Sequence, residues 1–265
     1  MNKLKINKII NKKNKDPIVC LTSYSKVISK ILDKYCDIIL VGDSVSMVVY
    51  GMKSTREIDI DTMILHCKAV KKSTSKSLVV FDMPYKTYTT KASAYKNAKR
   101  AITQTKCDAV KLEGGKKISH IINFLVKKKI PVMGHIGLLP QSSKNFKFKG
   151  QTKSEQNKIL QDAISITNAG VFSIVVECVE ENLARKITKN VKVPTIGIGA
   201  SKYCDGQILV TDDMIGLSDI HPKFVKVYAN IKKIIEKSVK NYYKDVKSKK
   251  FPTSKNIYLL NKNER

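Results

Sequence analysis

Short apolar runs recur along the whole chain, and each is mostly valine, isoleucine and leucine. The runs occupy residues 17–24, 37–44, 77–84, 109–115, 130–137, 172–179, 193–200 and 207–214. Strands that are covered on both faces have this composition, because neither side of the strand meets water. The pattern therefore predicts eight buried strands, which are typical of a parallel sheet.

Most of the segments between these runs have the period of an amphipathic helix. In KVISKILDKY, for example, Val27, Ile31 and Leu32 fall on one side and the lysines on the other. Alternating strands and helices indicate the α/β class, and eight such units predict a closed (β/α)8 TIM barrel. The alternative is an open, doubly wound sheet, but the first run is not followed by the G-x-G-x-x-G that a dinucleotide-binding sheet needs there.

We expect a single catalytic barrel domain over residues 1–265, with additions at both ends. Residues 1–16 form a lysine-rich arm, and its weak amphipathic pattern predicts a helix across the bottom of the barrel. The segment SKYCDG, between the last two strands, is too short for a full helix. A long helix is predicted from Pro222 to about Val246, and residues 248–265 form a C-terminal tail.

The charge of the chain is strongly positive. Fifty lysines and arginines oppose 22 aspartates and glutamates, which gives a formal net charge of +28. One interpretation is a nucleic-acid-binding surface. However, only four of the basic residues are arginine, the side chain that recognises phosphate and guanine with two parallel hydrogen bonds. We therefore attribute the charge to a composition bias, and we expect no specific nucleic-acid partner.

The cysteines and the apolar runs limit where the protein works. The six cysteines are scattered without C-x-x-C spacing, so neither a zinc site nor a disulfide framework is predicted. The N-terminal residues lack the apolar core of a signal peptide, and no apolar run approaches the ~18 residues of a membrane span. We expect a cytoplasmic protein without a membrane partner.

Charged and polar residues end several of the predicted strands. In a TIM barrel the active site lies at the carboxyl ends of the strands, so these positions are the candidates for function. They are Asp43, Ser44, Asp82, Lys111, Glu113, His135 and Glu177. Each of them alone has an ordinary structural explanation, such as a helix cap, a turn or a buried ion pair.

Together, the four carboxylates are harder to explain by structure alone. Crowded into one pocket, they would repel each other and lose hydration, and a single lysine does not compensate them. A cation would. Oxygen ligands without a cluster of cysteine or histidine suit Mg²⁺. The sequence therefore predicts a magnesium site with Asp43 among its ligands.

Motifs at these strand ends are similar, in order and spacing, to those of one enzyme family. They are VGDSVSMVVYG, FDMPY, VKLEGG, PVMGHIGLLPQS, VVECV, PTIGIGAS, DGQILV and HPKF, and the resemblance covers roughly residues 17 to 230. The chain thus resembles ketopantoate hydroxymethyltransferase (3-methyl-2-oxobutanoate hydroxymethyltransferase). The resemblance implies an Mg²⁺-dependent barrel that transfers a hydroxymethyl group from methylenetetrahydrofolate to 3-methyl-2-oxobutanoate. It also implies the product 2-dehydropantoate, on the route to pantothenate and coenzyme A, and a homo-oligomer such as a decamer.

The resemblance further implies a role for each strand-end residue. The implied metal ligands are Asp43, Asp82 and Glu113. The implied substrate contacts are Asp43, Ser44, Asp82, Lys111 and His135, with the lysine on the substrate carboxylate. Glu177 is the implied catalytic residue, the acceptor of the proton that leaves the substrate.

Two departures from the family pattern bear on these expectations. Ser46 stands where the family usually has glycine, and we expect its Cβ to narrow the approach of substrate or cofactor. The loop over residues 142–155 is shorter and richer in lysine, and we expect it to help close over the folate.

The alternative enzyme is an Mg²⁺-dependent carbon–carbon lyase or phosphoenolpyruvate mutase-like protein acting on a 2-oxo acid. Such enzymes also work through an enolate, so Asp43 and Asp82 alone do not discriminate. The motifs KLEGG and GHIGLLPQS favour the transferase.

Overall fold

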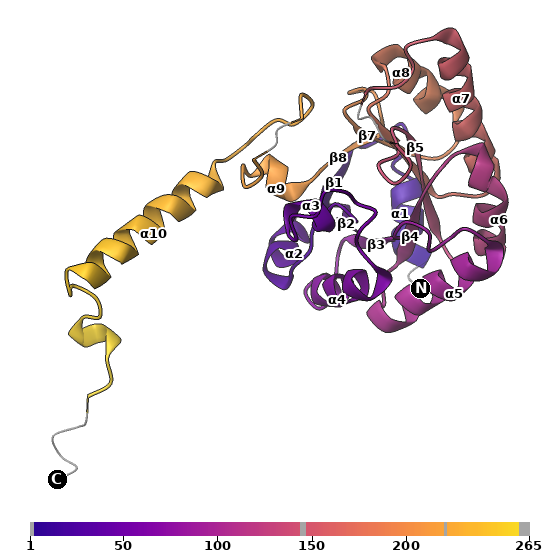
Figure 1. Cartoon of the computed structure of the whole chain (residues 1–265). Coiled ribbons are helices and arrows are strands. Elements are labelled where there is room, and N and C mark those ends of the chain that lie inside the picture. Colours follow the sequence, from indigo (N-terminus) through magenta and orange to yellow (C-terminus); the bar gives the residue numbers. More distant parts are fainter. Residues whose placement is uncertain (1–2, 144–146, 220–221, 260–265) are drawn as a thin grey trace. The chain divides into compact units, whose positions relative to one another are not determined.

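The computed structural model describes residues 3–143, 147–219 and 222–259. In this part of the chain eight parallel strands pair in sequence order and close into a barrel (Figure 1). The strands are β1 (Ile18–Thr22), β2 (Ile38–Val41), β3 (Leu78–Asp82), β4 (Ala109–Glu113), β5 (Val132–Gly137), β6 (Ser173–Glu177), β7 (Thr195–Ile198) and β8 (Gly206–Leu209). The predicted TIM barrel is confirmed, and the open sheet is excluded.

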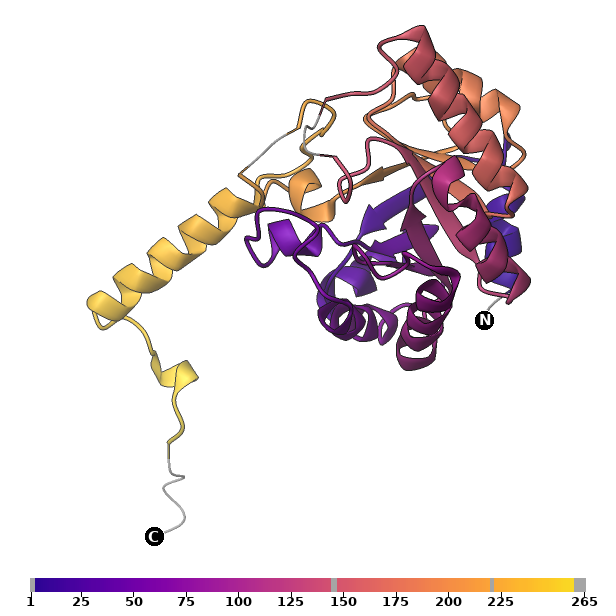
Figure 2. The same ribbon diagram turned by 45° about the vertical axis from the view of Figure 1, so that its right-hand side comes forward.

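Helices that lie between consecutive strands in the chain cover the outside of the barrel, as two views show (Figures 1 and 2). In order along the described residues, the helices of the chain are α1 (Lys3–Ile10), α2 (Lys26–Leu32), α3 (Val45–Val48), α4 (Ile60–Lys71), α5 (Lys91–Thr105), η1 (Lys116–Ile118), α6 (Ser119–Lys127), α7 (Lys153–Asn168), α8 (Glu181–Asn190), α9 (Thr211–Met214), α10 (Ile231–Lys247) and η2 (Ser254–Asn256). Residues 199–205, all of which are described, contain no helix, as the segment SKYCDG predicted.

Polar side chains fix where several of the long helices begin. Asp59 and Thr152 each accept a hydrogen bond from a main-chain N–H in the first turn, in α4 and α7 respectively. Thr90 and Ser93 form a reciprocal capping box at the start of α5. These bonds satisfy N–H groups that have no partner inside the helix, which stabilises each end by roughly 1 kcal/mol.

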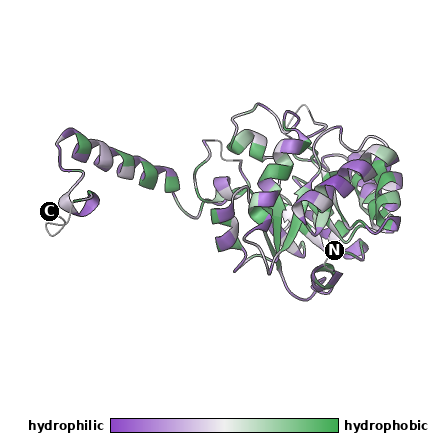
Figure 3. Ribbon diagram, turned by 90° about the horizontal axis from the view of Figure 1, so that it is seen from below, coloured by the Kyte–Doolittle hydropathy of each residue, from purple (hydrophilic) through white to green (hydrophobic). Residues whose placement is uncertain are grey.

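The apolar core has two layers, one outside the strands and one inside the barrel. The outer layer packs the strands against α4 to α8. The strands of the barrel are coloured largely as hydrophobic in Figure 3. The inner layer contains strand residues such as Ile38, Leu78 and Val80 together with Ile6 and Ile9 of α1. The predicted helix of the N-terminal arm therefore exists, and it closes the amino-terminal end of the barrel.

Contacts within the chain divide it into two compact units. The first comprises residues 1–211 and 222–225 and contains the barrel, and the second comprises residues 212–221 and 226–265. In the second unit, α10 begins at Ile231, later than the predicted start at Pro222, and the Asn230 side chain caps it. Among the described residues, no helix combines the length and the apolar character that a bilayer crossing requires.

Candidate active site

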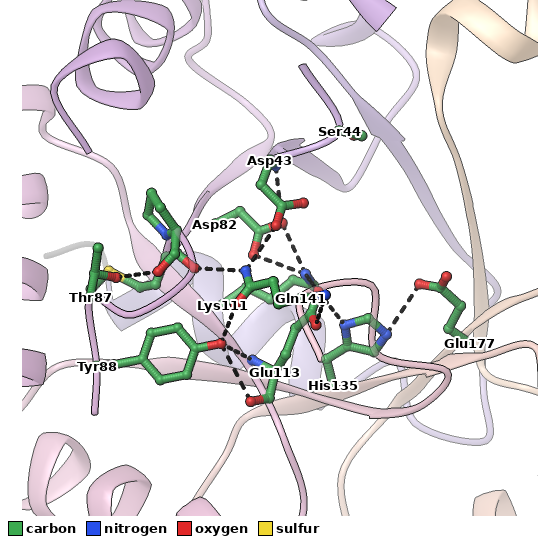
Figure 4. Close-up of polar contacts among 12 residues, drawn as sticks. Asp43, Ser44, Asp82, Thr87, Tyr88, Lys111, Glu113, His135, Gln141 and Glu177 are labelled. Carbon is green, nitrogen blue, oxygen red and sulfur yellow. Dashed lines mark hydrogen bonds and ion pairs between the residues drawn. The ribbon is translucent and has the colours of Figure 1, made fainter. Parts of the chain in front are cut away.

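The strand register brings the predicted residues to one end of the barrel. Lys111 and Glu113 are two positions apart in β4, so both side chains point into the barrel while Leu112 packs outward. Across the sheet, Asp82 lies in register with Lys111, and Glu113 lies in register with His135. The carboxyl ends of β3, β4 and β5 thus place four ionisable side chains side by side (Figure 4).

Lys111 forms the central ion pair of this group. Its Nζ lies 2.9 Å from each carboxylate oxygen of Asp82 and 3.8 Å from Oε1 of Glu113. All three side chains are buried. Burial opposes the charge of the lysine, but the carboxylates of Asp82, Glu113 and Asp43 outweigh it and raise its pKa. Lys111 is therefore a permanent positive charge at the site.

His135 lies between two glutamates. Its Nδ1 is 3.5 Å from Oε1 of Glu113, and its Nε2 is 3.2 Å from Oε2 of Glu177. Burial and Lys111 lower the pKa of the imidazole, whereas the two glutamates raise it, with a net rise to about 9. Burial likewise opposes ionisation of Glu113, but His135 and Lys111 lower its pKa overall. At neutral pH, His135 is thus a second cation of the site.

Asp43 follows β2 and adds a carboxylate beside Asp82. Its main-chain N–H donates to Oδ2 of Asp82 at 3.3 Å, and both side chains are buried. Burial, followed by the charge of Asp82, raises the pKa of Asp43 well above its ordinary value. Burial and Glu113 also raise the pKa of Asp82, although Lys111 opposes this. The carboxylates are therefore too close for the available cations to balance them fully.

The donor set fits a hard divalent cation in its chemistry. Among the described residues, no three histidine, cysteine, aspartate or glutamate side chains already form a metal-binding group, and Lys111 lies among the carboxylates. Yet Oε1 of Glu113 is buried without a hydrogen bond, and the pKa values of Asp43 and Asp82 are raised. The charges of Asp43 and Asp82 are thus incompletely compensated, and carboxylate oxygens are the ligands that Mg²⁺ prefers.

The remaining predicted residues lie at the edge of this group. The Oγ of Ser44 is 2.8 Å from the hydroxyl of Tyr24, which follows β1. Ser46 is buried, and its hydroxyl donates to the main-chain oxygen of Asp43 at 2.8 Å. The side chain of Ser46 therefore contacts the turn that carries Asp43. Part of the loop over residues 142–155, which we expected to close over the folate, lies outside the described residues. The same is true of His221, the first residue of the HPKF motif.

Sequence reasoning did not single out two buried residues that contact the group. Gln141 follows β5, and its side-chain Nε2 donates to Oδ2 of Asp43 at 2.8 Å. Its main-chain N–H donates to Oε2 of Glu113 at 3.0 Å. The hydroxyl of Tyr88 donates to Oε1 of Gln141 at 2.5 Å. Gln141 belongs to the motif GLLPQS, but an uncharged residue in a loop gives no charge signal of its own.

The fold and this group of side chains define an α/β-barrel enzyme with its ionisable groups at the carboxyl ends of the strands. Solved structures share the barrel. Phosphonopyruvate hydrolase in complex with oxalate and Mg++ has a TM-score of 0.61 at 8% identity, over 95% of this chain and 93% of that one. 2,3-Dimethylmalate lyase has a TM-score of 0.62 at 11% identity, over 94% and 85%. At these identities the likeness establishes the fold alone.

Sequence comparison identifies the family. The model of the ketopantoate hydroxymethyltransferase family matches residues 3–254. The 3-methyl-2-oxobutanoate hydroxymethyltransferase of Pelagibacter ubique (strain HTCC1062) is 56% identical over 97% of this chain and 100% of its own length. That of Anaplasma marginale (strain Florida) is 49% identical over 96% and 93%. The chain belongs to the ketopantoate hydroxymethyltransferase family. The predicted enzyme class is confirmed, and the lyase alternative loses its basis beyond the shared fold.

Proposed function

We propose that this enzyme transfers a hydroxymethyl group from methylenetetrahydrofolate to 3-methyl-2-oxobutanoate, giving 2-dehydropantoate for pantothenate and coenzyme A. The identity of 56% to a relative named 3-methyl-2-oxobutanoate hydroxymethyltransferase supports this choice of substrate. The observation that carries the mechanism is the buried group of Asp43, Asp82, Lys111 and Glu113 at one end of the barrel. A 2-oxo acid is an anion that needs both a cation and a proton acceptor to react at C3.

In this proposal Asp43, Asp82 and Glu113 hold Mg²⁺. When bound, the ion withdraws electrons from the keto group and so favours loss of the C3 proton. The raised pKa values of Asp43 and Asp82 support this assignment, because a divalent cation would relieve the repulsion that causes them. The three ligands come from separate strand ends, so the closed barrel is required to assemble them.

Lys111 holds the carboxylate of the substrate. It is fully charged at neutral pH, and it is already oriented by the two oxygens of Asp82. Ser44 is suited to donate a hydrogen bond to the substrate from its hydroxyl or its main-chain N–H, with Tyr24 beside it. His135, which the two glutamates hold in its charged form, donates to the product. These contacts orient C3 and exclude water from it.

Glu177 accepts the C3 proton. Its side chain lies at the end of β6 and is 16% exposed, more than the 1% of the His135 side chain that contacts it. It is therefore the carboxylate of the group most accessible to an incoming substrate. The carbanion character that develops at C3 then attacks the one-carbon unit of the folate and forms the new carbon–carbon bond. The bond from that carbon to the folate nitrogen breaks, water supplies the hydroxyl group of the product, and tetrahydrofolate leaves, so no covalent bond to the protein is needed.

A product assay tests this function. The protein is incubated with 3-methyl-2-oxobutanoate, Mg²⁺ and methylenetetrahydrofolate, and 2-dehydropantoate is measured by mass spectrometry with and without EDTA. We expect product that requires the folate and disappears with EDTA. Cleavage of a 2-oxo acid without folate would instead favour the lyase, and full activity in EDTA would remove the metal from the mechanism.

We also propose a homo-oligomer, in which α10 of one copy packs on another. Outward-facing residues of β2 to β6 are buried, whereas Val19 of β1 is 46% exposed and Gln207 of β8 is exposed. In α10, Ile234, Ile235 and Val239 are exposed on one face. A second copy supplies apolar cover for both surfaces. Light scattering should give a mass several times 29.8 kDa; a monomer would contradict the proposal.

A cytoplasmic location remains a prediction from the sequence.

A further inference from the structure

We propose that Gln141 is a positioning residue that holds two of the proposed metal ligands, Asp43 and Glu113, in place for Mg²⁺. The inference rests on the proposed function, since it concerns the same metal site. It assigns a role to a loop residue that carries no charge and is not itself a ligand. Figure 4 shows Gln141 between the two carboxylates.

Gln141 contacts the two ligands through different groups. Its side-chain Nε2 donates to Oδ2 of Asp43 at 2.8 Å, and its main-chain N–H donates to Oε2 of Glu113 at 3.0 Å. Asp43 follows β2 and Glu113 ends β4, whereas Gln141 belongs to the loop after β5. One residue thus connects two ligands that come from different parts of the barrel. Each bond uses one carboxylate oxygen, and Oε1 of Glu113 is left without a hydrogen bond.

The side-chain amide has only one favourable orientation. Nε2 also donates to the main-chain oxygen of Met83 at 3.0 Å, and Oε1 accepts from the hydroxyl of Tyr88 at 2.5 Å. Turning the amide over would place Oε1 against the oxygens of both Asp43 and Met83, which repel it. Tyr88 is itself fixed by the main chain of Glu113, whose N–H donates to the Tyr88 hydroxyl at 3.2 Å. Tyr88 and Met83 therefore determine that the amide presents a donor to Asp43.

Burial makes this arrangement rigid. Gln141 is 2% exposed, and Asp43 and Glu113 are each 5% exposed. A buried hydrogen bond that cannot exchange with water restricts both partners. Residues that orient metal ligands in this way typically change metal affinity by roughly 10–100-fold when they are replaced.

The test measures Mg²⁺ binding to the metal-free protein by isothermal titration calorimetry. The first variant, Gln141→Met, keeps the length of the side chain and removes its three amide hydrogen bonds, to Asp43, Met83 and Tyr88. The main-chain bond to Glu113 remains. The second, Tyr88→Phe, keeps Gln141 and removes the hydroxyl that orients it. The control is Gln151→Met, the same change at an exposed glutamine further along the same loop, whose side-chain amide donates to the main-chain oxygen of Phe148. Thermal unfolding of each metal-free variant checks that it is folded.

We expect the dissociation constant for Mg²⁺ to rise by roughly 10–100-fold in Gln141→Met, by less in Tyr88→Phe, and not at all in Gln151→Met. Saturating Mg²⁺ should restore most of kcat, so that the apparent KM for the metal carries the loss. If Gln141→Met does not fold, Tyr88→Phe decides the question. Unchanged Mg²⁺ affinity in the folded variants would overturn the role of Gln141 and leave the metal site standing. Absence of Mg²⁺ binding to the unaltered enzyme would instead overturn the metal site itself.

Discussion

Buried or half-buried carboxylates occur at both ends of this barrel, and their surroundings are opposite. At the amino-terminal end, Asp33 accepts hydrogen bonds from the main-chain N–H groups of Ser75, Lys76 and Ser77. Its pKa falls to about 2, because these bonds outweigh the burial that raises it. At the carboxyl-terminal end, the pKa of Asp43 is raised by burial and by Asp82. The charged form of Asp33 therefore stabilises the fold, whereas ionisation of Asp43 is unfavourable in its surroundings.

The same contrast extends to other aspartates at the amino-terminal end. Asp108 accepts from the N–H of Val79 and pairs with Lys71 at 2.8 Å. Asp205 accepts from the N–H of Thr195 and pairs with Lys13 at 2.8 Å. Each joins a loop to a neighbouring strand through donors that the backbone supplies. Charged groups that are fully paired stabilise, whereas crowded ones are retained for binding or chemistry, which is why perturbed pKa values mark functional sites.

The largest expected effect is that of Glu177→Gln, which removes the proposed proton acceptor while keeping its shape. We expect turnover to fall on the order of 10²–10⁴-fold, the usual contribution of a positioned base, with little change in thermal stability. Steady-state formation of 2-dehydropantoate measures it. The control is Glu180→Gln, three residues further on at the N-cap of α8, which should leave turnover unchanged. Turnover of Glu177→Gln close to that of the unaltered enzyme would remove Glu177 from this role.

The next effect concerns Asp43, which lies among the crowded carboxylates at the carboxyl-terminal end of the barrel. Asp43→Asn removes one negative charge and keeps an oxygen that can accept from Gln141. We expect Mg²⁺ to bind at least ~10–100-fold more weakly, the loss typical of a change even beyond the direct ligands. The metal-free protein should be as stable as the unaltered one or more so, because repulsion with Asp82 is relieved. Calorimetry and chemical unfolding measure the two quantities, and a large loss of stability would contradict the proposed crowding.

The same substitution at Asp33, at the amino-terminal end of the barrel, should lower stability and leave Mg²⁺ binding unchanged. Asp33→Asn removes a charged acceptor from the N–H groups before β3, and we expect the free energy of unfolding to fall by about 1–3 kcal/mol. Binding of Mg²⁺ should not change, because the site lies at the other end of the barrel. Urea unfolding at pH 7 and calorimetry measure this pair of effects. An altered Mg²⁺ affinity would mean that the two ends are not independent.

The smallest effect is a dependence on pH. Asp33 has a pKa of about 2 in the folded protein and ~3.9 in an unfolded chain. A lowered pKa means that the folded state binds the proton more weakly, so the stabilisation is complete above pH ~4 and is lost as the pH falls towards 2. The difference in stability between the unaltered protein and Asp33→Asn should therefore narrow as the pH falls from ~4 to ~2, as urea unfolding would show. A constant difference would exclude ionisation of Asp33 as its source.

Local sequence patterns determined the strands of the barrel, their order and the residues at their ends. This was possible because burial on both faces, helical period and strand-end position are properties of short segments, and a closed parallel barrel has one natural order for them. The family followed from motifs that occupy those same ends. The start of α10 was less well determined, because its periodic pattern extends over residues that Asn230 separates from the helix.

Only the tertiary structure determined which side chains of the site contact one another. The register of β3 and β4 sets Lys111 against Asp82, and closure of the barrel brings Gln141 from the loop after β5 to Asp43 beyond β2. Neither contact has a signal in sequence spacing, since the partners lie far apart in the chain. The pKa of a buried group depends on such distances and on the water it has lost, and both are fixed only when the barrel closes.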